Sequence, residues 1–266
     1  MTDASKTPED LYAEAVEDVR RLAKKAARGT PPKVRLSRHT ARLLEGVSAT
    51  PAPPRAAAVC GPPDGLERIA DEVRGCTACP LHATRHHTVP GEGNPNADLV
   101  FVGEAPGADE DARGRPFVGR AGQLLTDIIE KGMKMRREDV FICNVLKCRP
   151  PDNRTPNPEE VACCEPFLIR QLDLLRPKVI CALGGTAAQT LLKTAATVGS
   201  LRGVWHTYHG IPLRVTYHPA YLLRSPGEKA KAWLDIQEVM KRLGTAPPPA
   251  SRSEEHTSEL QSRQSI

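Results

Sequence analysis

Short apolar runs alternate with amphipathic stretches from about Gly65 to Leu243. Four apolar runs have the length and composition of buried strands, and they cover residues 98–103, 140–146, 178–183 and 211–217. Amphipathic stretches predict helices over residues 121–133, 159–175, 186–192 and 229–243. Strands that alternate with helices indicate a parallel sheet covered on both faces. The pattern therefore predicts an α/β fold, a three-layer α/β/α sandwich with a four-stranded parallel sheet.

The two ends of the chain differ from this middle part. Residues 8–28 have a weak helical period in which acidic residues precede basic ones, as suits a helix dipole. Many of the 25 prolines lie between this segment and Gly65, or after the last predicted helix. We divide the chain into an N-terminal extension with a Pro-rich linker (1–64), a globular domain (65–244) and a tail (245–266). The extension is helical or disordered, and its helix could bind a partner that the sequence does not identify.

Part of the tail has a separate origin. The run RSEEHTSELQS, Arg252 to Ser262, matches the in-frame translation of a sequencing adapter. We interpret residues 252–266 as an assembly artefact and exclude them from the fold.

Charge and cysteine content narrow the class of protein. No stretch is apolar for long enough to span a bilayer, and the N-terminus lacks the layout of a signal peptide, so we expect a cytoplasmic protein. Thiols stay reduced there, and eight cysteines then indicate metal ligands or buried bystanders rather than disulfides. The net charge of +5 is compatible with a nucleic-acid partner but does not require one.

Polar motifs follow three of the four predicted strands. GEAPG comes after the first strand, NVLKC lies at the end of the second, and HPAYLL comes after the fourth. GEAPG lacks the lysine and the glycine spacing of a phosphate loop, yet a Gly-Pro turn lets backbone amides approach a ligand closely. Because ligands of parallel sheets bind at the carboxyl ends of strands, these motifs predict one shared site.

Four cysteines predict a metal centre beside that site. Cys76 and Cys79 form a CxxC motif, and Cys148 and Cys164 lie far downstream around the polar segment RPPDNRTPNP. Four thiolates bind either a zinc ion or an iron–sulfur cluster. Cys143 and Cys181 lie in apolar strands and are predicted to be buried bystanders. A centre on all four ligands would tie the loops of the site together.

Five motifs together resemble the iron–sulfur (type A) uracil-DNA glycosylases of family 4, in the uracil-DNA glycosylase superfamily. They are CTACPL, GEGNPNADLVFVGEAPG, GRPFVGRAGQLL, NVLKCRPPDNRTPNP and HPAYLLR, spread over about Cys76 to Leu243. The resemblance implies a [4Fe–4S] cluster on Cys76, Cys79, Cys148 and Cys164. It also implies a nucleoid-associated, monomeric DNA repair enzyme that excises uracil from single- and double-stranded DNA and leaves an abasic site. No lysine stands out as a Schiff-base nucleophile, so we expect a monofunctional enzyme.

The resemblance also implies roles for individual residues. The Asn144 amide would accept from uracil N3–H and donate to O4, and Phe117 would stack on the base. Gly103 and Ala105 would line the substrate pocket. His218 would donate to uracil O2 as negative charge develops on the leaving base. Leu222 or Leu223 would fill the gap that the flipped base leaves in the duplex.

Activation of water is the least determined part of this expectation. Ala105 stands where the best-known branch of the superfamily carries an aspartate. Glu104, Glu110 and Asn153 are candidates for positioning water or supporting a cationic sugar. Asp109 and Asp111 are interpreted as solvated. Basic residues of the cysteine-flanked segment are suited to phosphate contacts, namely Lys147, Arg149 and Arg154.

Two other functions remain open from the sequence. One is a non-catalytic or covalent protein that binds uracil-containing or abasic DNA. The covalent branch uses a histidine in an arginine-rich loop, and RPPDNRTPNP contains none. The other is a nucleic-acid module that zinc stabilises and that performs no chemistry.

Overall fold

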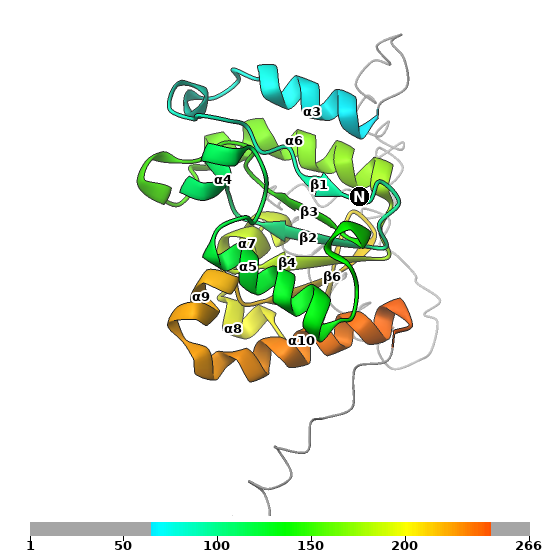
Figure 1. The fold of residues 1–266 in the computed structure, drawn as a ribbon. Helices are drawn as coiled ribbons and strands as arrows, with labels where there is room; N and C mark the ends of the chain where they lie inside the picture. Colours follow the sequence, from blue (N-terminus) through cyan, green and yellow to red (C-terminus); the bar gives the residue numbers. More distant parts are fainter. Residues whose placement is uncertain (1–64, 246–266) are drawn as a thin grey trace, which may run out of the picture. The chain divides into compact units, whose positions relative to one another are not determined.

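The computed structural model describes residues 65–245 (Figure 1). The predicted helix over residues 8–28 and the segment 252–266 lie outside the described residues, so the proposed domain boundaries stay predictions. Within residues 65–245, no helix is long and apolar enough to cross a membrane.

A mixed sheet of six strands forms the centre of the fold, in the order β1-β3-β2-β4-β6-β5 (Figure 1). The four central strands are parallel to one another: β3 (Phe141–Asn144), β2 (Leu99–Gly103), β4 (Val179–Leu183) and β6 (Ile211–Thr216). Two antiparallel strands form the edges, β1 (Glu92–Gly93) and β5 (Trp205–Tyr208). The α/β architecture is confirmed and the four predicted strands form its parallel centre, but the two edge strands were not predicted. Strand β1 has only two residues and β5 is mostly not buried, so neither produces an apolar run.

Helices cover both faces of this sheet (Figure 1). Those that pack on the central strands include α5 (Arg120–Asp127), α6 (Pro158–Leu175), α7 (Gly185–Leu192) and α10 (Lys229–Leu243). The predicted helix at 121–133 is instead α5 followed by a π-helix, Ile128–Gly132, in which the Met133 N–H donates to the Ile128 carbonyl oxygen at 2.8 Å. The helix pattern of apolar residues does not reveal this local widening.

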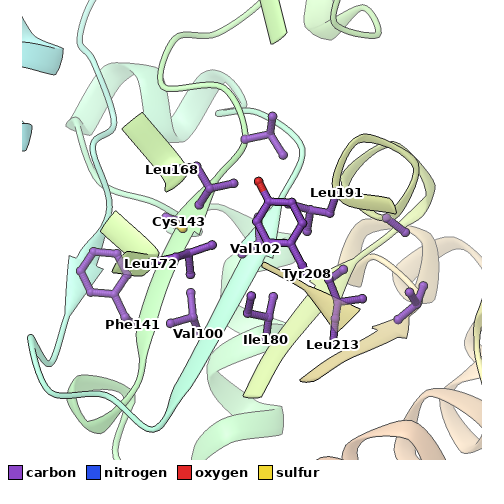
Figure 2. Packing of buried hydrophobic residues seen from close by; sticks show 14 of the residues in the cluster. Val100, Val102, Phe141, Cys143, Leu168, Leu172, Ile180, Leu191, Tyr208 and Leu213 are labelled. Carbon is purple, nitrogen blue, oxygen red and sulfur yellow. The ribbon is translucent and has the colours of Figure 1, made fainter. Parts of the chain in front are cut away.

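The central strands are apolar on both faces because each face packs on helices. In β2, Val100 and Val102 lie in one cluster with Leu168 and Leu172 of α6 (Figure 2). Phe101 lies in the cluster on the opposite face, with the α5 and α10 side chains. Burial of these side chains, each worth about 1.5–3 kcal/mol, fixes the strand ends to which the polar motifs are attached.

The remaining helices connect these elements. They are α3 (Leu66–Gly75), η1 (Pro80–Ala83), α4 (Ala108–Arg113), η3 (Arg137–Asp139), η4 (Pro151–Asn153), α8 (Val198–Leu201), α9 (Pro219–Arg224) and η5 (Pro226–Glu228). Helix α3 contacts α6, and α9 contacts α5. The cysteine-bearing segment after α3 thereby lies near the start of α6, which carries Cys164.

Candidate active site

A cavity of about 480 Å³ opens at the carboxyl ends of the parallel strands. Its walls come from the loop after β2, the end of β3, the segment around η4, and α9. All of the predicted catalytic residues line it, together with two of the predicted substrate-binding side chains and Ala105: Glu104, Ala105, Glu110, Phe117, Asn144, Asn153 and His218. Segments separated by more than a hundred residues therefore converge as the sequence analysis expected.

Asn144, the last residue of β3, is buried without a partner for its side chain. It is 1% exposed, and neither Oδ1 nor Nδ2 has a hydrogen-bond partner among residues 65–245. Gly103 lies opposite it in the parallel register, and a Cβ at Gly103 would lie 2.3 Å from Asn144 Oδ1. Position 103 must therefore be glycine for the amide to face the cavity. A buried amide that bonds to nothing costs free energy unless a ligand completes it.

Phe117 and His218 form the aromatic part of the cavity. Their ring centroids are 5.7 Å apart and the ring planes differ by 33°. Phe117 has a φ of 51°, which is uncommon for a bulky residue and requires a loop that enforces it. The same ring lies close to Gly103, where an added Cβ would lie 2.6 Å from Phe117 Cζ. The floor of the pocket thus combines an aromatic face with the edge of an amide.

Glu110 enforces the conformation of that loop. Its Oε1 accepts from the backbone N–H groups of Val118 and Gly119 at 2.9 and 3.0 Å, and its Oε2 accepts from Gly107 at 3.1 Å. The carboxylate is therefore committed to three amides, two of which directly follow Phe117 in the chain. Glu110 was expected from the sequence to position water or support a cationic sugar, although its place three residues after Gly107 is the spacing of a capping box.

His218 caps α9 and is held in a single tautomer. Its Nδ1 accepts from the Ala220 N–H at 3.1 Å, so the ring proton resides on Nε2. Burial, reinforced by the Arg224 charge, lowers the pKa of His218 to about 4. The side chain is thus a neutral hydrogen-bond donor at physiological pH.

The Glu104 and Asn153 side chains differ in whether they already have a hydrogen-bond partner. The Glu104 carboxylate lines the cavity and forms no hydrogen bond with any side chain or amide of residues 65–245. The Asn153 Oδ1 accepts from Arg149 Nε at 2.8 Å, and Asn153 has a φ of 54°. Glu104 is therefore the acidic group that can meet water or a sugar in this cavity.

The two candidate wedge leucines of helix α9 differ in their exposure to solvent. Leu222 is 2% exposed and belongs to the interior, whereas Leu223 is 37% exposed. Of the pair, Leu223 is the residue that can reach a base stack. Tyr221 and Arg224 also line the cavity and were not predicted. Their three-residue separation on a helix, which places side chains on one face, was the available signal.

The predicted metal ligands surround a second cavity. Cys76, Cys79, Cys148 and Cys164 line it, with Cys163 beside them. Arg85 Nη1 donates to Cys148 Sγ at 3.1 Å, and the Lys147 N–H donates to Cys164 Sγ at 3.2 Å. Within residues 65–245, no group of three or more His, Cys, Asp or Glu side chains is arranged to hold a single metal ion.

The chemistry of these thiols fits a multi-iron group. Burial raises the pKa of the Cys79 and Cys148 thiols and raises that of Cys164 to about 11. Thiolates at these positions therefore need positive charge close by, and N–H donors aimed at the sulfur atoms are typical of iron–sulfur sites. Cys143 and Cys181 are buried in β3 and β4, as predicted.

Lys147 and Asp111 are buried against expectation, and Arg154, which lines the cavity, has an acidic partner. Lys147 is 1% exposed and cannot contact a phosphate. Arg154 forms a two-pronged ion pair with Glu160, with contacts of 2.5 and 2.9 Å. Asp111 is not solvated: its carboxylate is buried and accepts from the backbone and ring of His86 at 2.9 and 2.7 Å. Each of these depends on a tertiary partner that a local pattern does not reveal.

Comparison with known proteins agrees with this fold. The family model of the Uracil DNA glycosylase superfamily matches residues 90–237. The Type-4 uracil-DNA glycosylase of Saccharolobus solfataricus is 43% identical over 192 residues, which cover 69% of this chain and 89% of the relative. The Type-4 enzyme of Thermotoga maritima is 50% identical over 165 residues, covering 60% of this chain and 84% of that protein. The chain belongs to the Type-4 uracil-DNA glycosylases within that superfamily.

Proposed function

We propose that this protein hydrolyses the N-glycosidic bond of deoxyuridine in DNA, releasing uracil and leaving an abasic site for base excision repair. The observation that carries the proposal is the Asn144 amide, buried in the cavity with both polar atoms unpaired. The names of the similar proteins support the same activity. The substrate is uracil-containing DNA, single- or double-stranded.

Recognition follows from the geometry of the cavity. A base within a duplex must be flipped out before the cavity can hold it. Phe117 then stacks on the base, while Asn144 accepts from N3–H and donates to O4. Cytosine presents the opposite polarity at these two positions and would leave the amide mismatched. Leu223 fills the vacated place in the stack.

Bond cleavage requires stabilisation of opposite charges on the base and the sugar. As the C1′–N1 bond breaks, His218 Nε2–H donates to uracil O2, where negative charge accumulates. The Glu104 carboxylate supports the positive charge of the sugar and orients a water molecule, whose oxygen bonds to C1′ and whose proton passes through solvent to the departing uracil anion. Glu110 acts indirectly by holding the loop that positions Phe117.

The four cysteines Cys76, Cys79, Cys148 and Cys164 would hold a [4Fe–4S] cluster. The cluster supplies a structural cross-link when bound, since glycosidic hydrolysis requires no electron. Cys148 and Cys164 flank the segment that contains Asn153 and Arg154, which line the cavity. These residues thus connect the cysteine site to the wall of the base pocket.

The decisive assay uses an end-labelled strand with one uracil, incubated with the iron-loaded protein and then heated in alkali. We expect cleavage at uracil that is absent without alkali, strongly reduced in Asn144→Ala and His218→Ala, and absent from matched strands with cytosine or thymine. A protein with its full complement of iron and sulfide that releases no uracil would contradict the proposal. A persistent shifted protein–DNA adduct would instead indicate covalent capture.

A further inference from the structure

A buried lysine connects the cysteine site to the base-reading amide. The Lys147 Nζ donates to the backbone carbonyl of Asn144 at 2.8 Å and to Gln171 Oε1 at 2.7 Å. Gln171 is itself fixed, because its Nε2 donates to the Pro90 carbonyl at 2.8 Å. The ammonium group is thus held against the residue whose side chain faces the cavity.

The backbone of the same lysine belongs to the cysteine site. Its N–H donates to Cys164 Sγ at 3.2 Å, its carbonyl accepts from the Val89 N–H at 2.8 Å, and the next residue is Cys148. One residue therefore contacts a proposed cluster ligand through its main chain and the uracil-reading residue through its side chain. The chain between Asn144 and Lys147 also donates to the Gly103 and Glu104 carbonyls at 3.0 Å each.

The charge of Lys147 has no carboxylate partner in the part of the chain that the structure describes. It is 1% exposed and forms no ion pair with any described residue. A buried ammonium that only neutral oxygens solvate is costly. The negative charge of metal-bound thiolates is the compensation within reach, because Lys147 lines the cysteine cavity and its N–H contacts Cys164 Sγ.

We propose that Lys147 is a positioning residue that the thiolate charge of the cluster holds in place and that in turn fixes Asn144 for uracil recognition. This inference rests on the proposed function and on its iron–sulfur site. It predicts that loss of the Lys147 charge changes both the cluster and the affinity for uracil, although the lysine touches neither the base nor the reacting bond.

The test compares the iron-loaded wild-type protein with Lys147→Met, Lys147→Arg and the control Lys193→Met, an exposed lysine paired with Glu165. Iron and sulfide content, the reduction potential of the cluster and the dissociation constant of free uracil are measured for each. We expect Lys147→Met to lower the reduction potential, since a positive charge beside the thiolates is lost. We also expect it to weaken uracil binding about tenfold, since the Asn144 carbonyl loses a charged donor. Lys147→Arg should recover part of the lost reduction potential and part of the lost uracil affinity. The control variant Lys193→Met should change neither quantity.

Wild-type affinity for uracil in an iron-replete Lys147→Met protein, or an unchanged potential, would overturn the inference. If that variant does not fold, Gln171→Glu replaces it, because a carboxylate beside Nζ neutralises the charge and keeps the Lys147 bond to Asn144, although the Gln171 bond to the Pro90 carbonyl is lost. It should lower the potential and leave uracil affinity within about twofold, and an unchanged potential would again contradict the inference. Failure of the wild-type protein to excise uracil from the labelled strand would instead refute the proposed function.

Discussion

Two buried polar side chains in this fold have opposite surroundings. Asp235 of α10 is buried, and its two carboxylate oxygens are paired with Arg202 and Arg214 at 2.9 and 3.0 Å. Asn144 at the end of β3 is equally buried, and neither of its polar atoms is paired within the described residues. A satisfied buried group stabilises the fold once its partners are present, whereas an unsatisfied one is retained at a cost in free energy. Asp235 thus belongs to the part of the molecule that stabilises the fold, and Asn144 belongs to the part that binds a base.

The largest expected effect is the loss of activity on replacing the unpaired amide. Asn144→Ala should reduce kcat/KM on a uracil-containing strand by about 10³-fold, because the polar edge of the base loses its partner. The free energy of unfolding should fall by less than about 1 kcal/mol, since the amide makes no bond in the free protein. Single-turnover kinetics and denaturant unfolding of the same preparation measure both. A large loss of stability with little loss of activity would remove the contrast with Asp235.

Asp235→Asn should show the reverse behaviour. Loss of the carboxylate charge leaves the buried Arg214 and the partly buried Arg202 without their counter-charge, and we expect a loss of about 3 kcal/mol in unfolding free energy. Activity well below the unfolding transition should change little. The matched control is Glu238→Gln, which removes an exposed ion pair with Lys241 and should change stability by less than about 0.5 kcal/mol. Equal effects of the two substitutions would contradict this account of Asp235.

Replacement of His218 should have an intermediate effect on the excision rate, and the contribution of this residue should depend on pH in a defined way. His218→Ala should slow excision about 100-fold. Because the pKa of His218 is lowered from 6.5 to about 4, its donor form persists well below neutral pH, and the wild-type rate should not lose this contribution until pH approaches 4. The unfolded chain binds a proton at higher pH than the folded one, so stability due to this group falls as pH drops from 6.5 to 4. His218→Gln should lack that part of the stability slope. A rate that halves near pH 6.5 through His218 would contradict a buried neutral ring.

The smallest effect distinguishes the two leucines of α9. Leu223→Ala should slow excision from double-stranded DNA about five- to tenfold and leave single-stranded substrate unaffected, because only a duplex requires the gap to be filled. Stability should change by less than about 0.5 kcal/mol at this exposed position. Leu222→Ala should instead destabilise the fold by about 2–4 kcal/mol, as a buried leucine does. Comparison of the two variants on both substrates identifies which leucine enters the stack.

The elements and residues with local signals were predictable from the sequence. The apolar period gave α10 its bounds, and the four central strands were found because both of their faces are buried. The edge strands β1 and β5 were missed since short, half-exposed strands owe their existence to a neighbouring strand.

The sequence predicted which residues line the candidate site, but it did not predict the hydrogen bonds and the burial that hold them in place. Motif residues such as Asn144, Phe117 and His218 do line one cavity. The bonds of Glu110 to the Val118 and Gly119 amides, and the burial of Lys147, arise only when distant segments meet. A lysine before Cys148 in a proline-rich segment has the local appearance of a solvated residue. Only the structure shows that it lies beneath the amide.

Titration of free uracil and free cytosine into the iron-loaded protein, followed by calorimetry, tests the central claim most directly. The account predicts that the wild-type protein binds uracil and not cytosine, and that Asn144→Ala binds neither although it unfolds like the wild type. Uracil affinity that survives in Asn144→Ala, or equal affinity of the wild type for the two bases, would show that the unpaired amide is not the group that reads the base.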